Sequence, residues 1–266
     1  MQTFPRDVRP KAPPIKTQGI KTKLVPFIFR SICWDAKGRW IEPFFGSGTV
    51  ALNAIPQKVL AADSNPHVIN FYRSVYTRAI TPADVRSYLE DEGAQLSKIG
   101  EDHYYAVRER FNRQGSPLDF LFLSRACFNG VMRFNKKGGF NVPFCRKPNR
   151  YQPALITKIV NQVDWAAKAM ARGDWEFKNQ DWRSTLAGVT AEDFVYCDPP
   201  YVGRHTDYYS QWSDDDAKLL ADRLKELPAA FAYSMWSSNK YRENTHLQEC
   251  FSGYPVALES HFYHVG

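Results

Sequence analysis

The groups best suited to chemistry in this chain of 266 residues form one run, Asp198-Pro199-Pro200-Tyr201. An apolar stretch at 194–197 precedes it and predicts the end of a buried strand. Because proline has no N–H, such a strand end leaves a carboxylate and bare carbonyl oxygens as acceptors, beside the aromatic face of Tyr201. This corner suits a flat substrate that carries an exocyclic NH₂. An Asp-Pro-Pro turn is also an ordinary way to end a strand, so the motif alone leaves the function open.

A second group of residues forms the turn Glu42-Pro43-Phe44-Phe45-Gly46-Ser47-Gly48. Glycines allow tight turning and close approach of a ligand to the backbone. The spacing is not Gly-x-Gly-x-x-Gly, no Lys-Ser/Thr follows, and an acid at the turn disfavours a phosphate. Asp63 ends the next predicted strand, about 20 residues later, where comparable folds bind ribose hydroxyls. Each feature alone fits a helix-entry turn or a helix cap, but the ordered pair favours a nucleoside cofactor.

The elements that must position these residues follow from the hydrophobic pattern. The order strand, glycine turn, helix, strand, acid predicts a βαβ unit within an α/β fold. Predicted strands cover 39–42, 59–63, 175–178, 194–197 and 229–235, with a strand pair near the C-terminus, and predicted helices cover 22–33, 49–55, 66–76, 154–171 and 214–227. Between them, 81–113 is helical in pattern, 118–132 is apolar and aromatic, and 133–150 has loop composition. We therefore predict a catalytic domain formed by 1–76 and 154–266, interrupted by an inserted domain at 77–153.

The net charge of +7 is concentrated in two segments. Residues 120–163 contain eight Lys or Arg and no Asp or Glu, and residues 1–30 contain seven against one acid. A solvated face usually mixes both signs, so these segments favour a polyanion as partner. Five scattered cysteines without a Cys-x-x-Cys pair, a polar N-terminus and the lack of a long apolar run predict a cytoplasmic protein without zinc or a membrane span.

Taken in order, the motifs resemble those of the Dam-type DNA adenine-N6 methyltransferases. The resemblance covers most of residues 14–265 and rests on five segments, at 16–21, 42–48, 62–66, 128–144 and 198–201. It implies a Rossmann-like, S-adenosylmethionine (SAM)-dependent methyltransferase sheet with an inserted, mainly helical target-recognition domain. It also implies SAM as the cofactor, with S-adenosylhomocysteine as the product.

The resemblance assigns cofactor-binding residues by motif position. They are Thr17, Lys21, Glu42, Phe44, Gly46, Gly48, Asp63, Asp181 and Asp198. Asp63 is expected to hold the ribose hydroxyls, and Asp181 to lie near the adenine amine of the cofactor. The family often has an aromatic residue where Thr17 stands, so one expected stacking ring is absent here.

The same resemblance assigns catalysis to Asp198, Pro199 and Tyr201. Asp198 and the Pro199 carbonyl would accept the two protons of the target amine, and Tyr201 would stack on the base, so the rate gain is largely positioning and electrostatics. Since an adenine inside a duplex is out of reach, the target base must be flipped out.

The DNA contacts are expected mainly in the segment 128–144. The expected residues are Lys16, Phe128, Asn129, Val131, Arg133, Asn135, Lys136, Lys137 and Pro143. Arg133 is suited to reading a guanine edge, and Lys136, Lys137 and Lys147 to contacting phosphates. For the phenylalanines Phe128, Phe134 and Phe140, packing in a core is an equally good interpretation. The match suggests a recognition site that contains GATC.

We therefore expect a monomeric enzyme that methylates adenine at specific sites in double-stranded DNA. Two alternatives remain: a methyltransferase for another planar amine or amide, and a DNA-binding relative with weakened catalysis. Asp198 disfavours the first, because Asn commonly stands there in such enzymes, whereas Thr17 and the chain end at Gly266 prompt the second. A loop with His205 and Asp207 is expected to close over the substrate, and Ser234–Lys240 to form a wall of the site.

Overall fold

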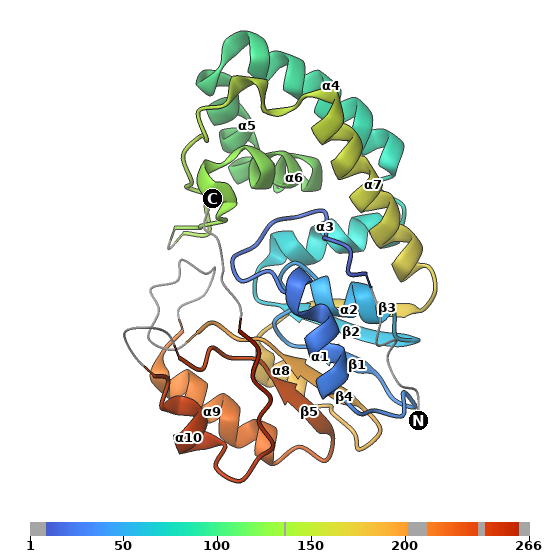
Figure 1. The fold of residues 1–266 in the computed structure, drawn as a ribbon. Coiled ribbons are helices and arrows are strands. Elements are labelled where there is room, and N and C mark those ends of the chain that lie inside the picture. Colours follow the sequence, from blue (N-terminus) through green and yellow to red (C-terminus); the bar gives the residue numbers. More distant parts are fainter. Residues whose placement is uncertain (1–8, 136, 202–211, 239–242, 261–266) are drawn as a thin grey trace.

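The computed structural model describes residues 9–135, 137–201, 212–238 and 243–260 (Figure 1). Within these residues, five strands form one sheet in the order β3-β2-β1-β4-β5, and every neighbouring pair is parallel. The strands are β1 (Trp40–Glu42), β2 (Lys58–Asp63), β3 (Asp174–Asn179), β4 (Phe194–Cys197) and β5 (Ala230–Tyr233). The structure thus confirms the prediction of an α/β, Rossmann-like sheet.

Helices cover both faces of the sheet, because alternate strand residues point to opposite sides. Trp40 and Phe194 belong to one core, whereas their neighbours Ile41 and Val195 belong to the other. On the first side lie α1 (Val25–Ser31) after a 3₁₀ turn at Thr22–Leu24, α2 (Thr49–Ala54), α3 (Pro66–Tyr76) and α7 (Pro153–Met170). On the second side lie α8 (Trp182–Leu186), α9 (Asp214–Lys225) and α10 (His246–Cys250).

The strand order places a topological switch point between β1 and β4. The chain proceeds from β1 outward to β2 and β3, then returns to β4 on the other side of β1. At such a point the connections leave in opposite directions, and a crevice forms beyond the carboxyl ends of the two strands. The turn that follows Glu42 and the run that starts at Asp198 are therefore brought together there.

A helical lobe lies at the end of the molecule opposite α9 and α10 (Figure 1). It contains α4 (Pro82–Ile99), α5 (Glu101–Gln114) and α6 (Pro117–Ala126), and α7 runs from it down to the sheet. Residues 119–126 of α6 are all buried, as expected of a helix at the centre of a core. Because the cores of the lobe and of one sheet face are continuous, the domain boundaries at 76/77 and 153/154 stay a prediction.

Most predicted elements are confirmed within two residues, and the differences have local causes. The helix predicted at 22–33 begins with a 3₁₀ turn and ends at Ser31, and the run at 118–132 is a helix only as far as Ala126. The strand pair predicted near the C-terminus is absent from the described residues 243–260, which contain α10 and irregular chain, and residues 261–266 lie outside the described part. There the rings of Phe251 and Tyr254 pack at a tilt against the ring of Phe231 on β5, without pairing as strands.

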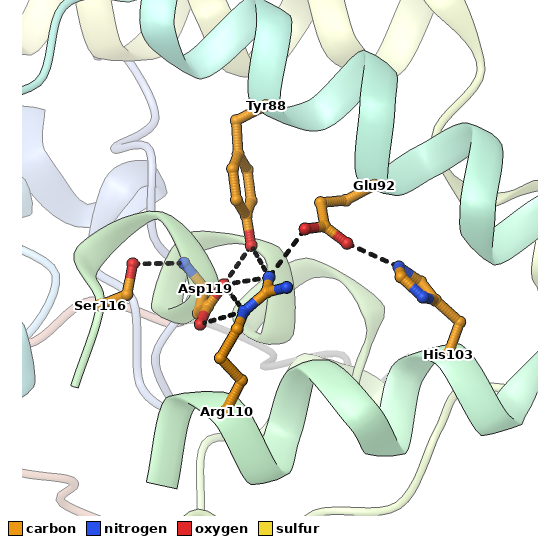
Figure 2. Close-up of polar contacts among 6 residues, drawn as sticks. All are labelled: Tyr88, Glu92, His103, Arg110, Ser116 and Asp119. Carbon is orange, nitrogen blue, oxygen red and sulfur yellow. Dashed lines mark hydrogen bonds and ion pairs between the residues drawn. The ribbon is translucent and has the colours of Figure 1, made fainter. Parts of the chain in front are cut away.

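A polar cluster joins the three helices of the lobe (Figure 2). Its centre is Arg110 of α5, whose guanidinium donates to both carboxylate oxygens of Asp119 on α6 and to Glu92 on α4 at 2.7 Å. The Tyr88 hydroxyl of α4 also donates to Asp119, and His103 of α5 lies 2.6 Å from Glu92. Since Asp119 is 1% exposed, these donors are what makes its burial tolerable.

We predict that Asp119→Ala lowers the free energy of unfolding by about 2–4 kcal/mol, because it leaves the half-buried Tyr88 hydroxyl without its acceptor and the Arg110 guanidinium with Glu92 as its remaining carboxylate. Urea denaturation followed by circular dichroism measures the change. The matched control is Glu90→Ala, which removes an exposed ion pair with Arg86 and is expected to cost less than about 1 kcal/mol. Equal effects of the two substitutions would show that the cluster does not hold the lobe together.

Candidate active site

A pocket opens at the crevice predicted between β1 and β4. It holds about 1040 Å³ of space, part of which is open solvent. Its lining comes from five parts of the chain: Thr17, Gln18, Gly19 and Lys21; Glu42, Phe44, Phe45, Gly46, Ser47, Thr49 and Val50; Asp63, Ser64, Asn65 and Val68; Met132 and Phe134; and Tyr196, Asp198, Pro200 and Tyr201. The N-terminal segment, the glycine turn, the end of β2, the segment around 132–134 and the end of β4 thus meet in one pocket.

A buried ion pair lies at the centre of this pocket. Lys21 Nζ is 2.6 Å from Asp198 Oδ2, donates to Gly19 O at 2.8 Å, and lies 5.2 Å from the centre of the Tyr201 ring. The Lys21 side chain is only 4% exposed and that of Asp198 is 20% exposed. Lys21 therefore fixes the orientation of Asp198 from one side.

The second oxygen of Asp198 is differently placed. Oδ1 is buried and has no hydrogen bond to the described residues. Burial raises the pKa of Asp198, while the charge of Lys21 and the nearby Ser234 and Tyr201 side chains oppose the rise. An acceptor oriented by a cation and still short of a donor is suited to binding an N–H group of a substrate.

Glu42 is a second buried carboxyl group in the pocket. Trp40 Nε1 donates to Glu42 Oε1 at 2.9 Å. Burial raises the pKa of Glu42 to about 8, which the Trp40 hydrogen bond only partly offsets. At neutral pH this carboxyl group is therefore mostly protonated, and a cation bound in the pocket would favour its ionisation.

Asp63 links the glycine turn to the end of β2. Its carboxylate accepts from Gly46 N and from Asn65 N, each at 2.8 Å. Burial raises the pKa of Asp63, and the two backbone donors oppose this rise. Gly48 does not line the pocket: its φ is +66°, and a Cβ there would lie 2.5 Å from the Phe45 ring, so this glycine makes the turn possible.

The remaining predicted cofactor and catalytic residues differ in position. Thr17 and Phe44 line the pocket, and so does Pro200, whereas Pro199 is buried beside it without being part of the lining. Asp181 caps α8 by accepting from Arg183 N at 2.9 Å and lies outside the lining. Ser234 lies near Asp198, but Trp236 is not part of the lining, and His205 and Asp207 are outside the described residues.

The segment predicted to contact DNA folds back on itself beside the pocket. Phe128 is 53% exposed, whereas Phe134 and Phe140 are buried, so core packing describes the last two. Arg133 donates to Asn141 Oδ1 at 3.0 Å, and Asn135 accepts from the backbone N–H groups of Lys137 and Gly139. Val131 is partly exposed and Pro143 is exposed, Asn129 has a positive φ of 54°, and Lys136 lies outside the described residues.

The basic charge near this segment is not all available to a partner. Arg125 is 4% exposed and donates to the carbonyls of Pro13 and Pro14 and to Gln162. Burial and the nearby Arg125 lower the pKa of the half-buried Lys16. Counting charges in the sequence could not reveal that Arg125 holds the N-terminal segment in place.

Sequence reasoning missed several residues of the pocket. Tyr196 sits in the middle of the apolar run before Asp198, and Met132 and Phe134 flank Arg133 inside the recognition segment. Ser47 and Thr49, whose hydroxyls are 2.7 Å apart, follow the glycine turn. The usable signal was position: Ser47, Met132 and Phe134 lie inside segments already singled out, and Thr49 directly follows one.

Among the described helices, none combines the length and the apolar character needed to cross a membrane.

Comparisons with known proteins agree with this geometry. The model of the family "D12 class N6 adenine-specific DNA methyltransferase" matches residues 18–265. A DNA adenine methylase of Serratia marcescens is 36% identical over 242 residues, covering 87% of this chain and 84% of that protein. A DNA adenine methylase of Vibrio cholerae is 30% identical over 253 residues, covering 90% and 84%. A DNA N-6-adenine-methyltransferase of Escherichia phage P1 is 33% identical over 231 residues, covering 82% and 28%.

We predict that Glu42 makes the ligand-free protein less stable as the pH rises from about 4.5 to about 8. In this window the carboxyl group stays protonated in the folded chain but ionises in the unfolded chain, so the unfolded state binds fewer protons. The free energy of unfolding then falls by up to about 1.4 kcal/mol per pH unit. Glu42→Gln removes this contribution. The free energy of unfolding of the variant, relative to that of the wild type, should therefore increase between about pH 5.5 and about pH 8, which lie within this window.

Urea denaturation at the two pH values checks this expectation. The control is Glu90→Gln, an exposed carboxylate on α4, which should follow the pH dependence of the wild type. A Glu42→Gln variant that also follows it would show that Glu42 ionises normally in the folded protein.

Proposed function

The chain belongs to the D12 class N6 adenine-specific DNA methyltransferases, and from this premise we propose that it transfers a methyl group from SAM to an adenine flipped out of double-stranded DNA. It is an adenine-specific DNA methyltransferase, so it acts on DNA and needs a methyl donor. The observation that carries the finer proposal is the contact of Lys21 with both Asp198 and Tyr201 in the pocket that the glycine turn shares.

The pocket residues fit SAM in chemistry. When bound, SAM supplies a methyl group on a positively charged sulfonium. Three carboxyl groups, of Glu42, Asp63 and Asp198, line the pocket and favour a cationic, hydroxylated ligand. We propose that Asp63 accepts from the ribose hydroxyls, that Glu42 favours the positive charge, and that the glycine turn with Phe44 lines the methionine end.

Lys21, Thr17 and Asp181 complete the proposed cofactor site. Lys21 and Thr17 would contact the cofactor from the N-terminal segment. Asp181 would contact its adenine, since Gln180 N donates to Asp63 O at 3.2 Å and so brings the start of α8 next to the end of β2. Arg183 donates to the Asp181 carboxylate, so Arg183 and the cofactor would both bind this carboxylate in the complex.

The catalytic step rests on three residues at the end of β4. Asp198 Oδ1 and the Pro199 carbonyl would accept the two protons of the adenine amine, while Lys21 holds Asp198 through Oδ2. Tyr201 would stack on the base and fix its orientation. A strong base is unnecessary, because the methylated amine cation is very acidic and Asp198 can take its proton. The residues thus act by orientation and electrostatics.

We propose that the segment around 128–144 recognises duplex DNA that contains GATC, and that the enzyme acts as a monomer. Phe128 is the one large apolar side chain of this segment that is strongly exposed among its described residues, so it is available beside a flipped base. Arg133 is suited to a guanine edge and would exchange its hydrogen bond with Asn141 for one with the base. Lys137, with Lys136, would contact phosphates, and Lys16, Asn129, Val131, Asn135 and Pro143 would lie around the target.

We predict that Asp198→Ala lowers turnover by at least about a hundredfold while DNA affinity stays nearly unchanged, because an acceptor for the amine proton is lost. Methyl transfer from tritiated SAM and electrophoretic mobility shifts measure the two quantities. Asp35→Ala, which removes an exposed carboxylate paired with Lys37, is the control and should keep wild-type turnover. Residual activity of Asp198→Ala above about a tenth would contradict the assigned role.

The recognition site can be determined by single-molecule methylation mapping of unmethylated genomic DNA after incubation with SAM. We expect N6-methyladenine within GATC, and a site that lacks GATC would refute that part of the proposal. Arg133→Ala should relax discrimination at one base pair by about 1–3 kcal/mol. Lys137→Ala is the control, and as a phosphate contact it should weaken methylation uniformly at all sequences. A uniform loss in Arg133→Ala would make Arg133 a phosphate contact as well.

A further inference from the structure

The recognition segment and the pocket share residues. Met132 and Phe134, which flank the proposed base-reading residue Arg133, both line the pocket. Side chains of successive residues in extended backbone point to opposite sides. Accordingly, Arg133 between them donates to Asn141 on the returning part of the segment and is not part of the lining.

Residues 139–141 run antiparallel to residues 133–135 and hold this arrangement in place. Phe134 and Phe140 form an isolated antiparallel bridge, Asn141 N donates to Arg133 O at 3.1 Å, and Asn135 N donates to Gly139 O at 2.8 Å. A shift of the backbone at Arg133 on DNA binding would therefore also move its two neighbours, because these hydrogen bonds join residues 133–135 to one returning stretch of chain.

Phe134 is also connected to the residues proposed to hold the cofactor. Its ring stacks on that of His67, with centroids 5.4 Å apart and planes at 10°, and it is only 9% exposed. His67 N donates to Asn65 Oδ1, and Asn65 N donates to Asp63 Oδ1 at 2.8 Å. A short chain of contacts thus leads from the recognition segment to the proposed ribose-binding acid.

A second connection runs along the N-terminal segment. A Cβ on Gly130 would lie 3.1 Å from Lys16 Cδ, so the backbone of the recognition segment packs directly on Lys16. The residues that follow, Thr17, Gln18 and Gly19, line the pocket and lead to Lys21. The recognition segment therefore touches the pocket wall from two sides.

We propose that Met132 and Phe134 are cofactor-positioning residues that couple DNA recognition to cofactor binding, each ligand raising the affinity for the other. This inference rests on the proposed function, because it takes the pocket to be the SAM site. Binding of either ligand would fix the same segment, so the second ligand meets a site that is already ordered. The coupling must be reciprocal, with one factor describing both effects.

The test uses S-adenosylhomocysteine, which binds without reacting, and a duplex that contains the mapped site. Calorimetry gives the dissociation constant of each ligand with and without the other. For the wild type we expect a coupling factor of about 5–150. Met132→Ala and Phe134→Ala should each weaken S-adenosylhomocysteine binding about three- to tenfold, as loss of one buried apolar contact does, and bring the coupling factor near one.

Two further variants separate positioning from folding. Phe134→Tyr keeps the ring that stacks on His67 and should restore the coupling. Leu219→Ala removes an apolar side chain that is exposed on α9, outside the pocket lining, and should leave the coupling at its wild-type value. If Phe134→Ala does not fold, Met132→Ala alone decides the question.

A coupling factor in Met132→Ala equal to that of Leu219→Ala would overturn the inference while leaving the proposed function intact. Failure of the wild type to bind S-adenosylhomocysteine at all would instead contradict the proposed function, and the inference with it.

Discussion

The arrangement of the site depends on the buried ion pair between Lys21 and Asp198. Two opposite charges this far from water are tolerated only when each has a good partner, so the 2.6 Å contact fixes the N-terminal segment against the end of β4. Without Lys21, Asp198 would be a buried carboxyl group with a raised pKa and no charge to oppose the rise. The pair thus joins two segments of the chain 177 positions apart and prepares one oxygen to accept from a substrate.

The sheet supplies the place where this pair can form. Parallel strands end at the same edge, and the order β3-β2-β1-β4-β5 brings the carboxyl ends of β1 and β4 side by side although they are far apart in sequence. Each face of the sheet packs against its own hydrophobic core. This packing holds the carboxyl ends of β1 and β4 in place relative to each other. Glu42, Asp63 and Asp198 are then three carboxyl groups held in one pocket, and burial raises the pKa of each. A set of acids that disfavours its own ionisation is suited to a cationic ligand, as the proposed function requires.

Sequence reasoning succeeded where a residue acts through its immediate neighbours. The strand before Asp198, the turn after Glu42 and the acid at the end of β2 follow from apolar runs, glycine and proline, whose effects are local. It could not predict that Lys21 pairs with Asp198, that Arg125 is buried under the N-terminal segment or that Phe134 lines the pocket. These features depend on how segments far apart in the sequence pack together. The excess of basic residues at 120–163 predicts a surface for a polyanion. One of these residues, Arg125, is instead buried and donates to Pro14 and Gln162.

This packing also constrains how the helical lobe can move relative to the sheet. α6 carries two buried charged residues, and each is satisfied by a different part of the molecule: Asp119 by α4 and α5 of the lobe, Arg125 by the proline carbonyls of the N-terminal segment. One helix therefore fixes both the lobe that bears the recognition segment and the segment that bears Lys21. Because the cores of lobe and sheet are continuous, the segment proposed to recognise DNA is packed as part of the whole and not as a separate module. DNA that displaces it would act on the proposed cofactor pocket, so the proposed link between site recognition and methyl transfer would follow from the fold itself.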